Sequence, residues 1–509
     1  MNIITRILLL LVTAICIYIS GWYVFHGSIV FHTDIARDFL LIEDIVKNKP
    51  LTLIGPRSGG IPGVFHGPLW LYLNVPAFVI GTGNPVTVGW FWMMLSIINL
   101  IVIFMTAQNL FRDQRISLFA VTLVAATTTA DIRSLYNPWG ALVLTPIFFH
   151  IYWRYLNTGK QIFLLSGIFI LGLIIQFQMA FGVPLLILTF IHVLRHLLRS
   201  KKYSHVLSFL IILIPLSTFI LFDLKHDFLQ SKAIFNFITG KVNTGKVEMP
   251  FLNLLDDRTR KVFTDGLGFL TFNKWFLFIP LLFMFFKAGE ELAKGKESKS
   301  RRLYLLLVYF YLGFWVLTLG FKGQIWGYYH WPFLGLLSMF FAALYKYVDR
   351  RLFYFIFIST LILNITSGIG KTVKNPDFIS EDGGSWKFYN RMTNDIYVDA
   401  DQDFGYYIFS GDQFAYTQRY AMNYRQKEFK NFRAFSFQKK KITYLILTPT
   451  DNPFLSVDGW KAGQVKLIKK PKKIFAYKNG IIVEKYELTP EEIEVPSDPN
   501  MIGATLIFR

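Results

Sequence analysis

The chain has 509 residues, of which 53% are hydrophobic and only 17% are charged, with a mean hydropathy of +0.40. A soluble globular protein of this length needs more charge to cover its core, so the composition excludes that class and indicates a membrane protein. The single cysteine excludes an intramolecular disulfide. The net charge of +20 does not indicate nucleic-acid binding, because basic cytoplasmic loops and contact with anionic membrane lipids explain it.

Apolar runs recur through the first 370 residues. Most approach the roughly 20 residues that a helix needs to cross a bilayer core of about 30 Å. No small-residue cleavage site follows the first run, so we expect it to be retained as a helix. In all we expect about eleven spans, at residues 3–23, 86–111, 116–130, 139–155, 162–176, 181–194, 206–222, 274–286, 304–319, 331–345 and 352–369.

The loops between these spans sort by charge. The intervening short loops hold at most one lysine or arginine each. The positive-inside rule therefore predicts a multi-pass protein of the plasma or inner membrane, with a cytoplasmic N-terminus and an extracytoplasmic C-terminal part. Basic residues concentrate in alternate loops, at residues 112–115, 154–160, 195–202, 287–302 and 346–351.

Residues 25–84 form a long first outer loop with two helix-like stretches. Residues 34–48 carry apolar side chains at helical spacing, and Thr33 or Asp34 is a suitable N-cap. Residues 68–80 are apolar but too short to span. We expect both stretches to be juxtamembrane helices at the outer surface.

Residues 371–509 form a polar tail of domain size. We predict a helix at 412–427, a hairpin-type turn at Asn479-Gly480, and strands at residues 406–410, 443–447, 464–468 and 480–486. The expected fold class is thus an all-α polytopic membrane protein over residues 1–370, followed by a small extracytoplasmic α/β or α+β domain.

The densest group of ionisable residues follows the first span. On a helix Asp34 and Asp38 share a face, and Arg37 lies beside them. A carboxylate at this place could act as general base on an acceptor hydroxyl. The alternative interpretation is an N-cap with a surface ion pair.

Further polar residues fall at the predicted outer ends of helices. A glycine-rich segment that contains Arg57 leads through His66 to Pro68, where backbone N–H groups can face an anion, although an ordinary loop explains the glycines better. The other residues of this kind suit a phosphate at headgroup depth, or anchoring at the membrane interface. They are Asn137, Gln176, Gln178, Lys225, His226, Lys322, Tyr328, Tyr329 and His330.

Two familiar motifs are incomplete. Gly370-Lys371-Thr372 lacks the first glycine of a phosphate-binding P-loop. The aspartates at 399, 401 and 403 are spaced as in a calcium-binding loop, but Phe404 replaces the required glycine, so we expect a solvated turn there.

Taken together, these parts resemble the GT-C glycosyltransferases, and locally the bacterial family 39-type enzymes related to protein O-mannosyltransferases and lipid A aminoarabinose transferases. The sequence TDIARD at 33–38 is similar to the Asp-x-Ala-Arg motif of their first loop. FHGPLWLY at 65–72 is similar to the helix start that follows it, and residues 328–332 are similar to a tyrosine-rich segment near the donor phosphate. Ile35 and Asn137 stand where relatives often have acids, so a divalent cation near Asp34 is left open.

This resemblance implies a membrane glycosyltransferase that moves a sugar, with inversion, from a polyprenyl-phosphate donor to an extracytoplasmic lipid, glycan or protein acceptor. Phosphate is a good leaving group, so one carboxylate base suffices, unlike in glycosidases. Asp34 and Asp38 are then the catalytic residues, and Asn137, Gln176 and Gln178 face the acceptor or the sugar. The residues that then bind the donor phosphate and its lipid are Arg37, Arg57, His66, Lys225, His226, Lys322, Tyr328, Tyr329 and His330.

Two other kinds of protein share much of this pattern. A transporter places ionisable residues near the bilayer midplane, whereas here they cluster at predicted helix ends, which argues against transport. A lipid-linked glycan ligase or polymerase usually carries its catalytic loop late in the chain, and the outer loop at residues 223–271 keeps that alternative open.

Overall fold

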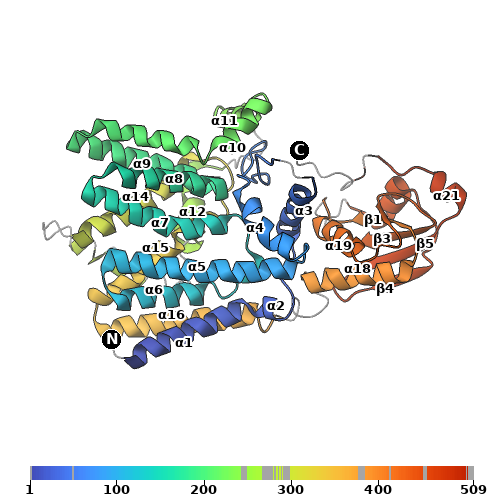
Figure 1. Ribbon diagram of the computed structural model, residues 1–509, viewed down its shortest axis with the longest axis horizontal. Helices are drawn as coiled ribbons and strands as arrows, with labels where there is room; N and C mark the ends of the chain where they lie inside the picture. The colour runs from blue at the N-terminus through green and yellow to red at the C-terminus, as the bar shows by residue number, and fades with distance from the viewer. Residues whose placement is uncertain are drawn as a thin grey trace. The chain divides into compact units, whose positions relative to one another are not determined.

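The chain forms two compact units in the computed structural model (Figure 1). Unit 1 comprises residues 1–21, 51–73 and 92–372, and unit 2 comprises residues 22–50, 74–91 and 373–509. The last boundary lies near the predicted division at residue 370, but unit 2 also takes parts of the first outer loop. The structure describes residues 3–48, 51–241, 249–265, 299–375, 384–411, 414–450, 455–499 and 501, and isolated positions between 279 and 290.

Unit 1 is built from helices. Helix α6 packs against α1, α15 and α16, while α7 packs on α8 and α8 on α9 (Figure 1). The helices α4 (Leu69–Ile80) and α5 (Pro85–Phe111) contribute residues to both units. The remaining helices of unit 1 are α1 (Ile3–Ser20), α6 (Gln114–Thr127), η1 (Ile132–Ser134), α7 (Pro138–Thr158), α8 (Gln161–Phe177), α9 (Met179–Ser200), η2 (Tyr203–Leu213), α10 (Ser217–Lys225), α11 (Leu229–Ile238), α12 (Phe251–Thr259), η3 (Arg260–Asp265), α14 (Lys299–Gly320), η5 (Gly327–Phe333), α15 (Leu334–Ala343), η6 (Leu344–Lys346) and α16 (Arg350–Lys371).

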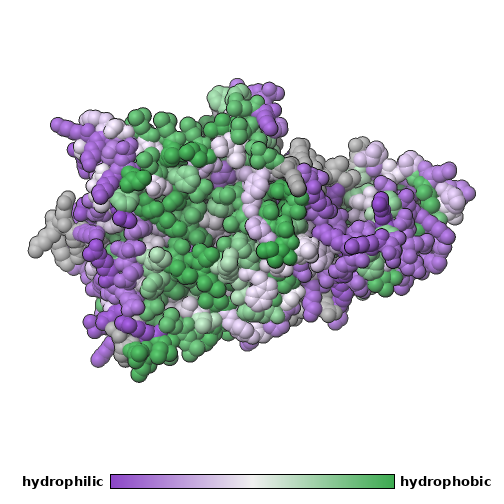
Figure 2. All heavy atoms as spheres, in the orientation of Figure 1, coloured by the Kyte–Doolittle hydropathy of each residue, from purple (hydrophilic) through white to green (hydrophobic). Residues whose placement is uncertain are grey.

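The lengths and apolar surfaces of these helices make the chain a multi-pass membrane protein. Among the described residues five helices are long and apolar enough to cross a bilayer, namely α1, α5, α9, α14 and α16, and the bent pair η2–α10 makes a sixth if it counts as one span. Helices α6, α7, α8 and α15 lie at four more of the expected spans but are shorter or less apolar. The span expected at 274–286 falls largely outside the described residues. Figure 2 shows the broad apolar surface that covers the helices of unit 1.

Unit 2 holds the first of the two helices predicted in the outer loop. Helix α3 (Thr33–Asn48) begins one residue earlier than expected. The Asp34 N–H in its first turn donates to the ring Nδ1 of His32 at 3.3 Å. Just before α3 the chain pairs with a distant segment, since Phe31 N–H donates to Gly384 and Trp386 N–H donates to Ile29. The short helix α2 (Trp22–Phe25) also belongs to this unit.

A five-stranded mixed sheet forms the C-terminal part of unit 2, as expected for an α/β or α+β domain. Its order is β2-β1-β3-β5-β4, with β1 parallel to β2 and β3, and β5 antiparallel to β3 and β4. Every residue of β1 and of β3 is buried, which is typical of strands covered on both faces. The elements are α18 (Trp386–Ala400), β1 (Phe404–Phe409), α19 (Tyr416–Gln426), β2 (Ala434–Ser436), β3 (Ile442–Leu447), α20 (Val457–Trp460), η7 (Lys461–Val465), β4 (Lys473–Ala476), β5 (Ile482–Glu487) and α21 (Pro490–Glu494).

One predicted strand of the tail is wrong. Residues 464–468 form the end of η7 and a turn at Lys466, whose φ is +56°. Val465 and Leu467 are both buried in the core, so their alternation mimics the period of a strand. The hairpin turn at Gly480, with φ +84°, is confirmed between β4 and β5. Asp412, expected to open a helix, lies outside the described residues.

Asp399 at the end of α18 ties that helix to the sheet. It accepts from Lys473 Nζ at 2.6 Å, from Lys485 Nζ at 2.8 Å and from the Tyr444 hydroxyl at 2.6 Å. Although burial raises its pKa, the hydrogen bonds from Lys473, Lys485 and Tyr444 outweigh burial and bring the pKa of Asp399 down to about 2. Asp403 accepts the N–H of Arg433. These aspartates therefore stabilise the tail domain, and Asp399 is not part of a solvated turn.

We predict that Asp399→Asn loosens the pairing of β4 with the rest of the sheet. The substitution leaves two lysines without their shared carboxylate, which costs about 1–3 kcal/mol. The amide hydrogens of β4 and β5 should exchange faster at neutral pH in this variant. Asp401→Asn is the matched control and should leave their exchange unchanged. Asp401 is exposed, and its left-handed backbone conformation is one that asparagine tolerates.

The pH dependence of stability provides a second measure of the Asp399 interaction. The folded pKa lies below the ordinary value, so the stabilisation is present above about pH 4 and is lost as the pH falls through about 2. The difference in melting temperature between the wild type and Asp399→Asn should therefore narrow over that range. A constant difference would contradict the ion-pair assignment.

Candidate functional site

Helix α3 of unit 2 carries the acidic group that the sequence singled out. Arg37 lies between the two aspartates: its Nη1 donates to Asp34 Oδ1 at 2.6 Å, and its Nε and Nη2 donate to Asp38 Oδ1 at 3.0 and 2.9 Å. Asp34, Arg37 and Asp38 therefore lie together on one side of the helix, as the sequence spacing predicted. Because both carboxylates already bind Arg37, its charge is largely balanced within the helix.

The two aspartates differ in exposure. The Asp34 side chain is 53% exposed, whereas that of Asp38 is 4% exposed. Burial raises the pKa of Asp38 to about 6, even though the Arg37 guanidinium lowers it. Within the described part of the chain, Asp38 Oδ2 is buried and has no hydrogen-bond partner. Asp34 is thus the accessible carboxylate, and Asp38 is the one that fixes the arginine.

The opposite face of α3 is anchored in unit 2. Phe39 packs edge-to-face on Tyr420 of α19, with ring centroids 5.2 Å apart. Buried Glu43 forms ion pairs with Lys47 and with Lys427, both at 3.1 Å. These contacts hold the helix in one orientation, so the position of Asp34 is set by packing.

The glycine-rich segment of unit 1 is an ordered loop. Its N–H groups are used internally: Gly55 donates to His66 O, Ser58 to Val64 O, and His66 to Pro56 O, at 2.7–2.9 Å. Arg57 and Phe65 form an isolated antiparallel bridge, and the Arg57 side chain is exposed. The segment does not present these backbone donors to an anion, in agreement with the ordinary-loop interpretation of the glycines.

The residues predicted to face the sugar or acceptor gather at the turn between α8 and α9. Gln176 Nε2 donates to Pro215 O at 2.6 Å and to Thr218 Oγ1 at 2.8 Å, while Asn137 Nδ2 donates to Phe177 O at 2.7 Å. Gln178 is fully buried, and neither of its amide atoms has a hydrogen-bond partner among the described residues. Gln176 and Asn137 therefore brace the turn, and Gln178 is buried within it.

The residues of unit 1 that are predicted to bind the donor phosphate come from several elements. Lys225 at the end of α10 and Lys322 beyond α14 are both exposed. His226 stacks on Phe222, with centroids 4.2 Å apart, and His330 is buried against Phe314. Tyr328 and Tyr329 contact each other edge-to-face at 5.0 Å.

Sequence reasoning missed Arg258 on α12. Its side chain is fully buried, and it pairs with Asp257 at 2.6 Å and donates to the carbonyls of Phe321 and Gly323 at 3.2 and 2.7 Å. Its Nε has no partner in the part of the chain that the structure describes. The signal available in the sequence was the Asp-Asp-Arg run at residues 256–258, inside the predicted outer loop at residues 223–271.

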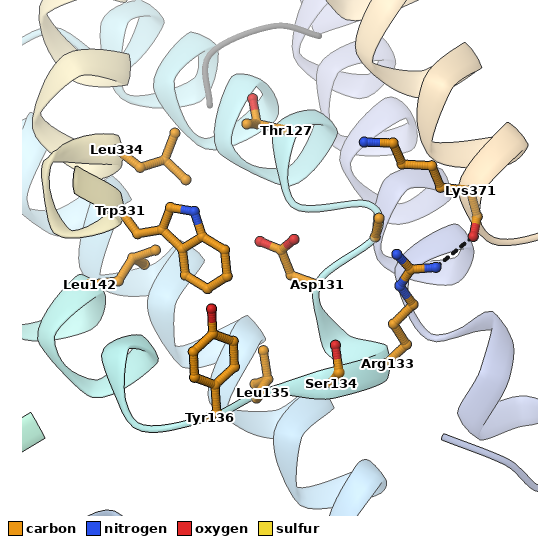
Figure 3. A pocket seen from close by; sticks show the side chains of 11 residues that line it. Thr127, Asp131, Arg133, Ser134, Leu135, Tyr136, Leu142, Trp331, Leu334 and Lys371 are labelled. Atoms are coloured by element: carbon orange, nitrogen blue, oxygen red, sulfur yellow. Dashed lines mark hydrogen bonds between the residues drawn. The ribbon is translucent and has the colours of Figure 1, made fainter. Parts of the chain in front are cut away.

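A cavity of about 350 Å³ opens in unit 1 where α6 connects to α7. Asp131, Arg133, Tyr136, Trp331 and Lys371 line it together with leucines and hydroxyl side chains (Figure 3). The carboxylate of Asp131 points into the cavity between Trp331 and Arg133. Sequence reasoning overlooked Asp131, because it follows an apolar helix and belongs to no motif.

A divalent cation near Asp34 stays a prediction. Among the described residues there is no group of three or more His, Cys, Asp or Glu side chains that could hold a metal ion. Asp34 and Asp38 contribute only two carboxylates, and Arg37 occupies both of them. We therefore assign no metal ligand.

The chain shares its fold with ArnT, one of the proteins that the sequence resemblance pointed to. Two solved structures of ArnT from Cupriavidus metallidurans share it. The structure bound to undecaprenyl phosphate is 10% identical over 97% of this chain and 99% of ArnT, with a TM-score of 0.59. The apo structure is 9% identical over 94% and 97%, also with a TM-score of 0.59. No protein-family model and no curated protein matches the chain. At these identities the likeness establishes the fold.

We predict that Gly67→Ala destabilises unit 1. A Cβ on Gly67 would lie 1.7 Å from Gln176 Oε1 and 2.8 Å from the Gln176 carbonyl oxygen, so the loop or α8 must move. Such overpacking costs about 1–3 kcal/mol and should lower the melting temperature in detergent. Gly59→Ala is the matched control, since nothing lies within 4 Å of its Cβ. Equal melting temperatures for the two variants would show that the loop does not pack on α8.

Proposed function

We propose that this protein is a membrane glycosyltransferase that moves a sugar from a polyprenyl-phosphate donor to an extracytoplasmic acceptor. The supporting observation is the fold shared with ArnT over nearly the full length of both chains, together with undecaprenyl phosphate bound in one ArnT structure. The transporter and the lipid-linked glycan ligase or polymerase are weaker alternatives, because the fold likeness favours neither.

In this proposal Asp34 is the general base. It takes the proton of an acceptor hydroxyl while the hydroxyl oxygen attacks the anomeric carbon, and the bond to the phosphate oxygen breaks so that polyprenyl phosphate leaves with the electron pair. The exposure of Asp34 supports this role, since a base must reach the substrate. Asp38 is a positioning residue, because it is buried and holds Arg37.

Cationic side chains then stabilise the departing phosphate. The exposed side chains of Arg57, Lys225 and Lys322 are accessible to a lipid headgroup, which supports their assignment to the donor. Arg37 contributes through its ion pair with Asp34. When Asp34 accepts a proton it loses its negative charge, so the guanidinium charge that had neutralised Asp34 can attract the departing phosphate.

We predict that Asp34→Asn lowers turnover of a polyprenyl-phosphate sugar by at least about 100-fold, because the base is lost. Asp38→Asn should lower it by a smaller factor. Asp44→Asn, which removes the same charge from a half-exposed position of the same helix, is the control and should retain activity. The measurement is sugar transfer in membranes that contain each variant at equal level. Unchanged turnover in Asp34→Asn would refute the base assignment.

We also propose that the N-terminus is cytoplasmic and that the C-terminal domain is extracytoplasmic, in the plasma or inner membrane. The alternation of basic loops along the chain supports this orientation. The reaction requires it, because the acceptor lies outside the cytoplasm.

Cysteine labelling tests this orientation cleanly, because the only native cysteine, Cys16, is buried. In intact cells or spheroplasts a membrane-impermeant maleimide should label Ile468→Cys, whose position is 89% exposed in the tail domain. Lys160→Cys, in a predicted cytoplasmic loop, should react only after permeabilisation. The reverse pattern would invert the topology and end the proposal of an outer-face reaction.

A further inference from the structure

The cavity between α6 and α7 combines two kinds of wall. One side is aromatic, with Trp331 and Tyr136 in contact at a centroid distance of 5.4 Å. The other carries the cationic side chains of Arg133 and Lys371, and the Lys371 ammonium reaches toward the cavity (Figure 3). A space lined by flat rings on one side and by charges on the other is suited to a ligand with a ring face and a charged substituent.

The elements that line the cavity are tied together. Arg133 Nη1 donates to the carbonyl oxygen of Lys371 at 2.7 Å, which links η1 to the end of α16. Tyr136 also contacts Tyr328, at a centroid distance of 5.7 Å, so the aromatic wall continues into η5. The cavity therefore has defined walls before any ligand enters, which reduces the entropy lost on binding.

Asp131 is the one acidic side chain on this wall. Burial raises the pKa of Asp131 to about 6, although the nearby Arg133 and Lys371 lower it. Its carboxylate points into the cavity (Figure 3). It thus carries acceptor oxygens for ligand hydroxyl groups, and its charge partly offsets the two cations.

We propose that this cavity binds an anionic saccharide, with the sugar ring against Trp331 and Tyr136 and the acidic substituent beside Arg133 and Lys371. The volume of about 350 Å³ lies at the low end of small-molecule pockets and suits one or two sugar rings. The rings of Trp331 and Tyr136 offer a flat face to a sugar ring, and Arg133 and Lys371 offer positive charge to its acidic substituent. This inference goes beyond the proposed transfer reaction and does not depend on the base on α3.

Charge gives the site a pH signature with a definite sign. The ionisable groups that line the cavity with Asp131 are Arg133, Lys371 and Tyr136. As the pH falls through about 6, Asp131 gains a proton and the cavity becomes more positive. An anion that does not itself titrate in this range should therefore bind more tightly at pH 5 than at pH 8, by about three- to tenfold.

The test is saturation-transfer NMR on the full-length chain purified in detergent. The probe is methyl glucuronide, a carboxylate sugar whose charge is constant from pH 5 to 8, and its neutral match is methyl glucoside. We expect saturation of the ring protons of the glucuronide and a much weaker signal from the glucoside. Octyl glucuronide distinguishes a lipid-borne headgroup from a soluble sugar, because tighter binding of the octyl compound indicates the lipid-borne source.

Three variants separate binding from folding. Arg133→Gln should weaken glucuronide binding at least about tenfold. Asp131→Asn should strengthen binding at pH 8 and abolish its pH dependence, a gain that a misfolded protein cannot produce. Lys232→Gln, at an exposed position of α11, should bind like the wild type. Equal signals from glucuronide and glucoside, or a pH dependence that survives in Asp131→Asn, would overturn the proposal.

Discussion

The hydrocarbon core of the membrane is the constraint on which the structure depends. It offers no water to backbone N–H and C=O groups, so the chain crosses it as helices. Ionisable side chains are then confined to helix ends and connections, where water and headgroups are within reach. The described structure follows this division: Asp131 and Arg133 lie in the connection between α6 and α7, and Lys225 lies at the end of α10.

The same constraint explains why most of the buried charges occur in pairs. Asp38 binds Arg37, Glu43 binds Lys427, and Arg258 binds Asp257. Taking a charge out of water is expensive, and a partner with hydrogen bonds offsets that cost only when the geometry is good. Two of these groups keep a buried polar atom without a partner within the described ranges, Asp38 Oδ2 and Arg258 Nε. Burial with incomplete pairing is a feature expected of functional sites.

The sequence was most informative where one physical rule dominates. Helical spacing located α3 to within a residue at its start, and Asn479-Gly480 marked the hairpin turn. The alternation rule for strands failed at Val465 and Leu467. Both side chains are buried, but a helical turn followed by Lys466 in the left-handed conformation places them there instead of a strand. The rule also missed β4, because this edge strand has only four residues, too few to show a clear alternation.

For the candidate site, spacing identified contacts within one helix but not contacts across the fold. Arg37 between Asp34 and Asp38 follows from helical geometry alone. The grouping of Asp131, Trp331 and Lys371 joins three segments separated by about 40 to 240 residues, and no local pattern encodes it.

The two acidic sites differ in what holds the carboxylate. On α3 the arginine is committed to both aspartates, so a change of charge on Asp34 is felt by Arg37 directly through a 2.6 Å contact. In the cavity Arg133 is bound to a backbone carbonyl, and Asp131 acts on it only through space. The first arrangement suits proton transfer coupled to a nearby cation, because the pair responds within one hydrogen bond. The second suits selection of a ligand by charge, because the field of the cavity changes while its walls stay in place.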